Sequence, residues 1–346
     1  MPNSAYVAAF LTALIASLIA TPAMRSLALR FGMLAKPSRR SVHSKPTPYL
    51  GGVAIYLAFA LSTFLFLGVD RPEVMGLFIG GFLMVALGTL DDLRPLSPKV
   101  KLLGQVVCAA VVTGFGVQVA WVTNPFGGMF HIGALAVPVT VLWIVAVTNV
   151  VNLIDGLDGL AAGISSIAAL TLLFVALRAG QAHVVLLTAA LAGSSLGFLP
   201  YNFNPAKIFM GDAGSMFLGF ALGAVAVEGT LKTVTLAALS VAILALGLPI
   251  FDTSFAIVRR VLKGRPFHQA DREHIHHRLL RLGLNQRQAV LLMYLVSAAL
   301  GVGAVLLTRL QVGPALLLFV FLMSGLYLGA KRLGVLDITK GEEFEG

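Results

Sequence analysis

The sequence ALAVPVTVLWIVAVTNVVNLIDGLDGLAAGISSIAALTLLFVALR, residues 134–178, decides the fold class of this chain. It consists of two apolar runs, 134–151 and 159–178, joined by a short polar segment at 152–158. An apolar run of about 20 residues is long enough to cross the hydrocarbon core of a bilayer. A backbone exposed to lipid must satisfy its own hydrogen bonds, so both runs should be helices. The segment therefore predicts two membrane-spanning helices with a short polar turn between them.

The rest of the chain has the same character. Its 346 residues are 58% hydrophobic and only 12% charged, and its mean hydropathy of +0.91 lies far above that of soluble domains. We predict an all-α integral membrane protein that forms one polytopic domain over residues 1–346, with about eleven transmembrane helices. The predicted spans lie near residues 4–24, 50–69, 74–90, 102–121, 134–151, 159–178, 183–200, 213–229, 233–251, 288–308 and 313–330.

The basic residues predict the orientation of these spans. When the spans cross alternately, one side receives only Arg71, Arg178, Lys232 and Arg309, and the rest of the 25 Lys and Arg fall on the other side. Positive charge marks the cytoplasmic side, so the N-terminus should lie outside and the C-terminus in the cytoplasm. The net charge of +10 is thus largely a topology signal. We expect no nucleic-acid partner, but a basic face that attracts anionic lipids and phosphorylated substrates.

Acidic and histidine side chains gather on the same predicted side. The cytoplasmic segments 25–49, 91–101, 152–158, 201–212 and 252–287 form the expected active face and hold several groups of polar residues. The lipid-facing middles of the spans hold no charged residue. This division predicts chemistry at the membrane surface, on a polar and phosphorylated substrate.

The first group lies at residues 88–101 and contains two adjacent carboxylates, Asp91 and Asp92. Adjacent carboxylates repel each other, so both remain ionised only where water or a cation compensates them. Mg²⁺ prefers oxygen ligands, commonly one or two carboxylates together with substrate phosphates. A solvated turn at a helix end accounts for the same residues, so this motif alone leaves both interpretations open.

The second group, Asn149-Val-Val-Asn152-Leu-Ile-Asp155-Gly-Leu-Asp158, occupies the turn of the opening segment. Asp155 and Asp158 would share one face of a helical turn, and the two asparagines have the same spacing just inside the membrane. Carboxylates at a helix start also compensate exposed N–H groups. Two amides and two acids are more than capping requires, so we favour a functional site.

The third group lies at residues 200–215 and includes Asn202, Asn204 and Asp212. Its Asn-Pro and Gly-rich steps indicate a loop. Asp212 then begins a long apolar helix, with Ser215 three residues later. The start of a helix presents free N–H groups to a phosphate, but Asp212 could equally serve only as the helix cap.

The fourth group lies in the longest cytoplasmic segment, at residues 265–278. On a helix, His274, His277 and Arg278 would share a face, whereas His276 would point elsewhere. Histidines could bind zinc, but the interleaved arginines would repel a dication and could instead bind a diphosphate. The alternative is a charged surface loop.

In their order along the chain, these motifs resemble those of the polyprenyl-phosphate N-acetylhexosamine-1-phosphate transferases (glycosyltransferase family 4). The resemblance extends from about His43 to His277 and includes the family's many-helix membrane architecture. A lone Asp-Asp pair is weak evidence, whereas the ordered set is specific. The set comprises Asp91-Asp92 with Ser97-Pro98-Lys99, Asn152-x-x-Asp155-Gly-x-Asp158-Gly, Gly211-Asp212-x-Gly-Ser215 and His274-Ile-His276-His277.

The resemblance implies a reaction at the cytoplasmic face of the bacterial inner membrane. The phosphate of undecaprenyl phosphate would displace UMP from a UDP-N-acetylhexosamine and leave a lipid-linked sugar diphosphate. This would be the first membrane step of a cell-envelope polysaccharide pathway. The cofactor would be Mg²⁺, with Mn²⁺ as a substitute, and relatives of this kind often form homodimers.

The resemblance also implies roles for individual residues. It assigns metal binding to Asp212, Asp91 and Asp92, and catalytic roles to Asp91, Asp92, Asp155 and Asp158, of which the last two line the catalytic and nucleotide-binding cleft. Among these, we choose Asp91 as the base for direct attack by the lipid phosphate, a simpler scheme than a covalent aspartyl intermediate. Substrate binding would fall to Lys45 (in His43-Ser-Lys-Pro-Thr-Pro), Lys99, Lys101, Asn149, Asn152, Asn202, Asn204, His274, His276, His277 and Arg278.

Several alternatives stay open at this point. The run His-Ile-His-His departs from the three consecutive histidines usual in the branch that transfers phospho-N-acetylmuramoyl-pentapeptide, so it favours the N-acetylglucosamine branch. A secondary transporter would place ionisable groups near the membrane midplane, and a polyprenyl-lipid phosphatase would not require the histidine segment. Asp252 either is functional or pairs with Arg259 or Arg260.

Overall fold

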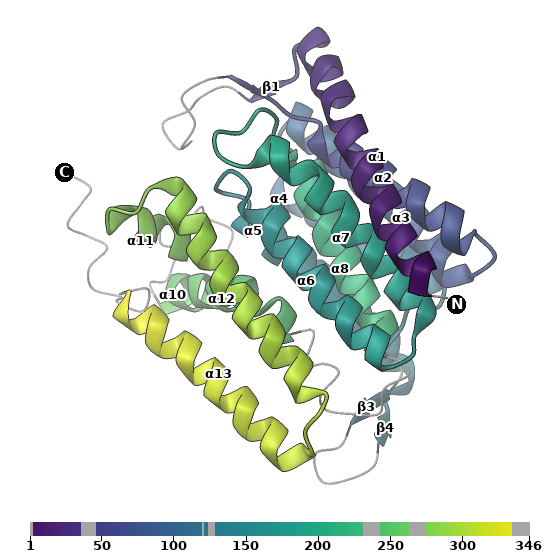
Figure 1. Cartoon of the computed structure of the whole chain (residues 1–346), viewed down its shortest axis with the longest axis vertical. Helices are drawn as coiled ribbons and strands as arrows, with labels where there is room; N and C mark the ends of the chain where they lie inside the picture. Colours follow the sequence, from purple (N-terminus) through teal and green to yellow (C-terminus); the bar gives the residue numbers. More distant parts are fainter. Residues whose placement is uncertain are drawn as a thin grey trace.

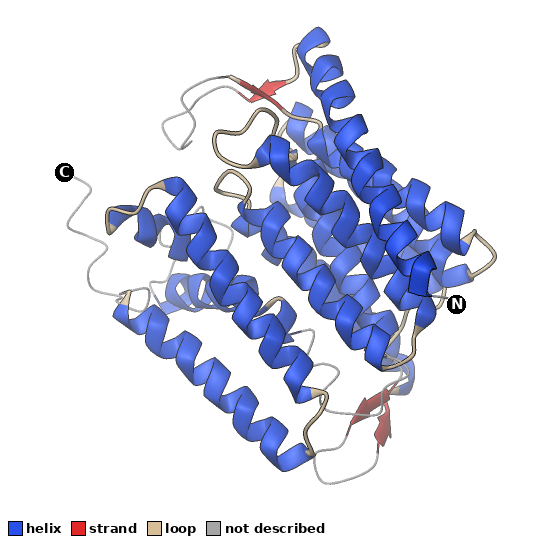
Figure 2. Ribbon diagram, in the orientation of Figure 1, coloured by secondary structure: helices blue, strands red, loops and turns tan. Residues whose placement is uncertain are grey.

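The computed structural model describes residues 3–35, 46–119, 121–123, 129–230, 243–262 and 274–333. Within these ranges the chain is mostly helical (Figure 2). Two short antiparallel pairs of strands accompany the helices. Strand β1 (Leu34–Ala35) pairs with β2 (Thr47–Pro48), and β3 (Trp121–Thr123) pairs with β4 (Met129–His131).

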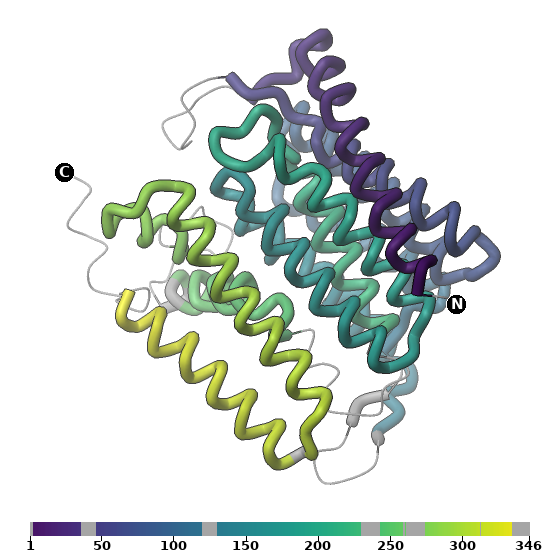
Figure 3. Tube along the Cα trace, viewed as in Figure 1, coloured from purple at the N-terminus to yellow at the C-terminus, as the bar shows by residue number. Residues whose placement is uncertain are grey.

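The helices form one bundle, shown in Figure 1. In chain order they are α1 (Asn3–Arg30), α2 (Gly51–Leu67), α3 (Pro72–Leu93), α4 (Pro98–Gly114), the 3₁₀ turn η1 (Gly133–Leu135), α5 (Ala136–Ile154), α6 (Leu160–Arg178), α7 (Ala182–Asn202), α8 (Gly211–Thr230), α10 (Gly247–Leu262), α11 (Ile275–Arg281), α12 (Gln286–Leu307) and α13 (Val312–Arg332). Segments distant in sequence lie side by side: Figure 3 shows α1 running beside α7, and the two helices are in extensive contact.

The prediction of an all-α, multi-pass membrane protein is confirmed. Within the described ranges, 7 helices are long and apolar enough to cross a bilayer: Asn3–Arg30, Pro72–Leu93, Gly133–Ile154, Leu160–Arg178, Ala182–Asn202, Gln286–Leu307 and Gly313–Arg332. Two further apolar helices, Gly51–Leu67 and Gly247–Val258, are shorter. Most of the predicted ninth span, 233–251, lies outside the described residues. The total of about eleven spans and their orientation remain predictions.

The outer surface of the bundle suits lipid rather than water. Leu142 on α5, and Leu317 and Phe321 on α13, are each at least 70% exposed. Large apolar side chains exposed to this degree and in this number are rare on soluble monomers. In a bilayer the same side chains contact hydrocarbon.

Helix α8 forms the centre of the bundle. It contacts α2, α3, α5, α6 and α7. Its side chains are buried from Ala213 to Glu228, and the large rings of Phe217 and Phe220 are fully enclosed. The first turn of α8 is therefore held by the surrounding helices, which matters because Asp212 lies there.

One end of the bundle, here called the acidic end, carries Asp91, Asp92, Asp155, Asp158 and Asp212. It is formed by the α3–α4, α5–α6 and α7–α8 connections, and the N-terminus of α1 lies at the opposite end (Figure 1). Side chains close in sequence cap the helices that begin at this end. Ser97 caps α4 by accepting a hydrogen bond from the Val100 N–H at 3.4 Å, and Asn285 and Gln288 form a capping box at α12.

In the segment 252–287, which is expected to be a loop, the described residues 252–262 and 274–287 contain more helix than their polarity indicates, and residues 263–273 lie outside the described residues. Helix α10 continues to Leu262, α11 lies within the segment, and α12 begins at Gln286. Hydropathy falls where a helix leaves the apolar core, but the backbone can stay helical beyond that point. The hydropathy of the segment therefore marks the end of the apolar run and not the end of the helix.

Candidate active site

Two glycines bring the start of α8 against α2 and α3. A Cβ atom on Gly52 of α2 would lie 2.1 Å from the Gly214 nitrogen, and one on Gly88 of α3 would lie 2.4 Å from the Ala213 Cα. These atoms belong to the backbone and cannot rotate away, so only glycine allows this approach. The contact places Asp212 beside the Asp91-Asp92 pair at the end of α3.

Asp92 caps α8 from the neighbouring helix. Its Oδ1 accepts a hydrogen bond from the Asp212 N–H at 2.9 Å, and its Oδ2 accepts one from the Ala213 N–H at 3.2 Å. The first N–H groups of a helix have no partner within the helix, and a carboxylate near them is stabilised by the helix dipole. Asp92, and not Asp212 itself, therefore supplies the cap, and the Asp212 carboxylate is free for other contacts.

The Asp212 carboxylate belongs to a cluster built around the Lys101 ammonium group. Lys101 Nζ contacts Asp91 Oδ2 at 2.9 Å and Asn152 Oδ1 at 3.2 Å, and it donates to Asp212 Oδ2. The Asn152 amide donates to Asp212 Oδ1 at 2.8 Å and to Ser215 Oγ at 2.9 Å. We call Asp91, Lys101, Asn152 and Asp212 the acid–lysine cluster. The four residues come from α3, α4, α5 and α8, and the sequence predicts each of them as a site residue.

The donor set of this cluster fits a cation that is shared with a substrate. In the described part of the chain, no group of three or more His, Cys, Asp or Glu side chains is arranged to hold a metal ion. Backbone N–H groups of α8 hold both Asp92 oxygens, whereas Asp91 Oδ2 and both Asp212 oxygens contact the side chains of Lys101 and Asn152, which can move aside for a cation. Mg²⁺ is commonly bound by one or two carboxylates together with substrate phosphates and water. Asp91 and Asp212 meet that requirement.

Three polar side chains hold the α5–α6 turn and the α7–α8 loop together. Asp158 Oδ2 accepts hydrogen bonds from Asn204 Nδ2 at 2.9 Å and from the Ala206 N–H at 3.0 Å. Asn202 is buried, accepts from the Gly159 N–H at 3.1 Å and donates to the Ile208 carbonyl at 3.1 Å. These contacts give Asp158, Asn202 and Asn204 a loop-fixing role in the structure.

Asp155 differs from the other carboxylates because no hydrogen bond to its side chain occurs within the described residues. Desolvation raises the pKa of Asp155 well above its usual value of 3.8, and the nearby carboxylates of Asp212, Asp92 and Asp158 raise that pKa further. A carboxyl group with a raised pKa and no partner is typical of a functional site. It is also a source of instability when ionised.

This instability gives a testable prediction for Asp155→Asn. Because the folded state raises the pKa of Asp155, it favours the protonated acid, and stability falls as the pH rises above the ordinary value of 3.8. The neutral amide removes this cost, so the variant should unfold at a temperature roughly 2–4 °C higher at pH 8. The gain should shrink toward pH 4. Thermal unfolding in detergent without divalent cations measures the unfolding temperature at each pH. A variant less stable than the parent at pH 8 would contradict the raised pKa of Asp155.

Helix α11 brings histidines to the Asp155 turn. The His276 ring lies so close to Gly156 that a Cβ there would be 2.7 Å from His276 Nε2. His276 is only 2% exposed, and neither of its ring nitrogens has a hydrogen-bond partner within the described residues. Desolvation lowers the pKa of His276 well below its usual value, and His277 and His274 lower that pKa further, so the ring is neutral. An unpaired buried polar group costs about 1–3 kcal/mol, which a bound ligand could recover.

The remaining predicted site residues lie outside the acid–lysine cluster. Asn149 donates to Gln105 Oε1 at 2.6 Å and to the Val145 carbonyl at 2.8 Å, inside the bundle. Lys99 is exposed at the start of α4, and His277 and Arg278 lie on α11. Lys45 lies outside the described residues.

Two polar residues inside apolar spans, Gln105 and Tyr294, contact the site but are not among the residues predicted from the sequence. Gln105 of α4 contacts Asn149, and the Tyr294 hydroxyl of α12 donates to the Gly159 carbonyl. Tyr294 also fills the space beside Gly163, where a Cβ would lie 2.0 Å from its ring. Polar side chains inside a predicted span are the signal that could have identified both, because they require a partner there.

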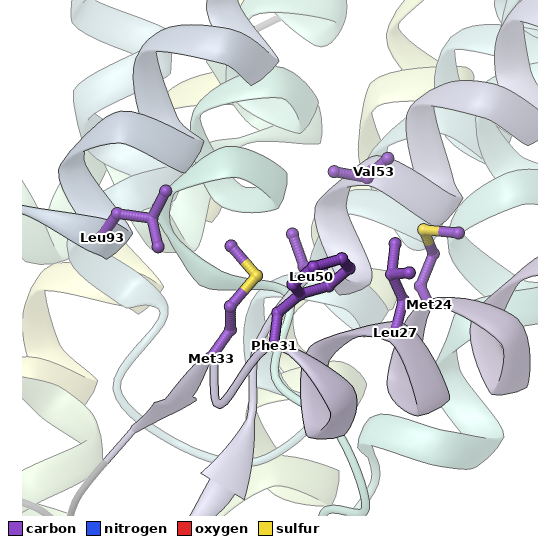
Figure 4. Close-up of a pocket in the computed structure, with 7 residues that line it drawn as sticks. All are labelled: Met24, Leu27, Phe31, Met33, Leu50, Val53 and Leu93. Carbon is purple, nitrogen blue, oxygen red and sulfur yellow. The ribbon is translucent and has the colours of Figure 1, made fainter.

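An apolar hollow adjoins the acidic end. Figure 4 shows the seven side chains that line it: Met24, Leu27, Phe31, Met33, Leu50, Val53 and Leu93. Its volume is about 470 Å³. Leu93 directly follows Asp92, and Leu50 directly precedes the glycine whose N–H donates to the Phe209 carbonyl in the loop before α8. The acidic end thus presents apolar surface directly beside its charged residues.

Comparison with known proteins identifies relatives along nearly the whole chain. Residues 74–230 match glycosyl transferase family 4. A Bacillus subtilis protein named as a probable undecaprenyl-phosphate N-acetylglucosaminyl 1-phosphate transferase is 40% identical over 332 residues, which cover 96% of this chain and 93% of the relative. The decaprenyl-phosphate N-acetylglucosaminephosphotransferase of Mycolicibacterium smegmatis is 36% identical over 85% of this chain and 80% of its own length. A Thermotoga maritima undecaprenyl-phosphate alpha-N-acetylglucosaminyl 1-phosphate transferase is 33% identical over 76% of this chain and 78% of the relative.

Proposed function

This chain belongs to glycosyl transferase family 4, and from that premise we propose that it transfers N-acetylglucosamine 1-phosphate from UDP-N-acetylglucosamine to undecaprenyl phosphate. An oxygen of the lipid phosphate forms a bond to the sugar-bearing phosphorus of the donor. The bond between that phosphorus and the bridging oxygen of UMP breaks, and UMP leaves. The product is a lipid-linked sugar diphosphate, the starting unit of an envelope polysaccharide.

The acid–lysine cluster is the observation that carries this proposal. Two anionic phosphates must approach each other, and their repulsion is reduced by basic groups and a cation held in a fixed position. Lys101 is held by Asp91, Asp212 and Asn152 at the end of the bundle, where polar and apolar surfaces meet. A soluble donor and a lipid acceptor can both reach such a position.

We assign the metal to Asp91 and Asp212, with Asp92 acting indirectly as the cap that fixes Asp212. Bound Mg²⁺, for which Mn²⁺ could substitute, would neutralise phosphate charge as the bonds exchange. The sequence predicts Asp91 as the base that deprotonates the lipid phosphate, but we now propose Asp155 for this role. Asp91 already accepts from the Leu96 N–H at 2.6 Å and from Lys101 at 2.9 Å. Asp155, in contrast, has no hydrogen-bond partner within the described residues.

The histidines of α11 are proposed to contact the UDP-sugar. His276 presents two ring nitrogens without partners in the described part of the chain, beside the turn that carries Asp155. His274, His277, Arg278, Lys99 and Lys45 complete the proposed substrate contacts. Asn149, Asn202 and Asn204 support the site through contacts within the bundle and its loops.

N-acetylglucosamine is preferred over the muramoyl-pentapeptide alternative because the relatives named above carry N-acetylglucosamine in their names. The same names favour a transferase over a transporter or a lipid phosphatase. We place the protein in the bacterial inner membrane, with the acidic end in the cytoplasm and the N-terminus outside, as the basic residues predict. A homodimer remains a proposal.

One assay tests the proposed function. Purified protein in detergent, with Mg²⁺, UDP-N-acetylglucosamine and undecaprenyl phosphate, should release UMP, and EDTA should stop the release. UDP-N-acetylgalactosamine and UDP-N-acetylmuramoyl-pentapeptide serve as competing donors, which should be used at least about tenfold less efficiently. If no UDP-N-acetylhexosamine yields UMP, the proposed enzyme activity is wrong.

A further inference from the structure

Asp252 of α10 is buried against the start of α11. It is 1% exposed, and its two carboxylate oxygens have separate partners. Oδ2 contacts His274 Nδ1 at 3.0 Å, and Oδ1 accepts a hydrogen bond from the Ile275 N–H at 2.9 Å. Asp252 thus fixes both the histidine side chain and the first N–H of α11.

These contacts determine how His274 is presented. An ionised carboxylate can only accept hydrogen bonds, so the Nδ1 atom of His274 must carry a proton. Fixing one ring nitrogen in this way sets both the tautomer and the orientation of the imidazole. His274, which is itself 4% exposed, is therefore held in one state.

The effect of Asp252 extends to the Asp155 turn through stacked rings. The His274 and His276 rings are parallel within 6°, with centroids 5.7 Å apart, and His276 lies against Gly156. A continuous line of contacts therefore runs from Asp252 through His274 and His276 to the turn that carries Asp155.

We propose that Asp252 is a positioning residue for the nucleotide-sugar donor. It acts through His274 and the start of α11, and holds His276 against the Asp155-Gly156 turn. This inference rests on the proposed function and deepens it, since it separates the donor side of the site from the acceptor side. Neither Asp252 nor any residue of α10 was assigned a role by the motifs of the sequence.

A second buried histidine–carboxylate pair provides a matched control. His183 Nε2 of α7 contacts Glu228 Oε1 of α8 at 2.8 Å, at the end of the bundle opposite the acidic end. Its side chains are 10% and 6% exposed, against 5% and 1% for His274 and Asp252. The two pairs have similar chemistry and burial, and differ in their distance from the proposed site.

The test compares Asp252→Asn with Glu228→Gln. Both variants keep the shape of the side chain and lose its charge, so both should lower the thermal unfolding temperature in detergent. Only Asp252→Asn should raise the KM for UDP-N-acetylglucosamine, by about 10- to 100-fold, the loss seen when a carboxylate that orients a functional histidine is removed at metal sites. The KM for undecaprenyl phosphate should stay within about twofold, because the contacts of Asp252 within the described residues are with His274 and Ile275 and not with the acid–lysine cluster. Equal changes in the donor KM for the two variants would show that Asp252 is only a structural residue.

A double-mutant cycle tests whether Asp252 acts through His274. The variant Asp252→Asn with His274→Ala should bind UDP-N-acetylglucosamine no more weakly than His274→Ala alone, since the contact with His274 is already lost and the Asn oxygen can still accept from the Ile275 N–H. His274→Asn keeps an N–H donor for Asp252 and should bind the donor more tightly than His274→Ala. Additive losses in the cycle would overturn the inference. A wild-type protein without UMP release would instead overturn the proposed function, so the two failures are distinguishable.

Discussion

Replacing Asp212 with Asn should reduce turnover about 100- to 1,000-fold, the range expected when one fixed electrostatic group of an active site is lost. Asp212 is the only carboxylate here that contacts both Lys101 and Asn152 among the described residues. The amide would lose the negative charge that holds Lys101 and that is proposed to bind Mg²⁺. The protein should still fold, because the α8 cap is supplied by Asp92.

UMP release and thermal unfolding in detergent measure these two effects separately. Asp70→Asn is the matched control, since Asp70 is an exposed carboxylate in the α2–α3 connection, at the opposite end of the bundle. It should keep near-normal activity. If Asp212→Asn retained activity comparable to this control, Asp212 would have no metal or charge-holding role.

Replacing Lys101 with Met should have the second large effect. The Lys101 ammonium is shared by Asp91, Asp212 and Asn152, so its loss leaves two carboxylates close together without compensation. Removing one partner of a partly buried ion pair is destabilising, because the remaining charge lacks its counterpart. We expect a lower unfolding temperature and a loss of turnover of about 100-fold or more.

Added Mg²⁺ gives this prediction a second measurement that does not depend on activity. A dication can compensate the two carboxylates that have lost Lys101 in the variant, and a ligand that binds only the folded state raises its stability. Mg²⁺ should therefore raise the unfolding temperature of Lys101→Met more than that of the wild type. Lys331→Met, which removes an exposed lysine at the end of α13, should change neither activity nor the response to Mg²⁺. An equal response in both variants would contradict the assignment of Asp91 and Asp212 as metal ligands.

The different contacts of Asp91 and Asp92 have a simple geometric cause. The two residues are adjacent in α3, so their side chains leave the helix in different directions. Asp92 points to the first turn of α8, and Asp91 points to Lys101 of α4. Asp92 therefore stabilises the start of α8, whereas Asp91 contributes charge to the acid–lysine cluster. The Asp-Asp motif alone does not distinguish these two roles.

The sequence by itself determined the fold class and the end of the bundle at which the chemistry lies. Apolar runs of membrane-spanning length force helices, because no other conformation satisfies the backbone in lipid. Charged residues are excluded from the lipid-facing middles, so the acidic residues had to gather at the helix ends. The ordered motifs added the family, which the relatives confirm.

Only the tertiary structure decided which of the polar residues are free to meet a substrate. Asn202 and Asn204 are used to join loops, and Asp252 orients His274 through a contact between α10 and α11. Residue patterns report the local periodicity and polarity of a segment. Contacts between distant segments depend on how closely backbones approach, and here that approach is set by the glycines of α2 and α3 against the first turn of α8.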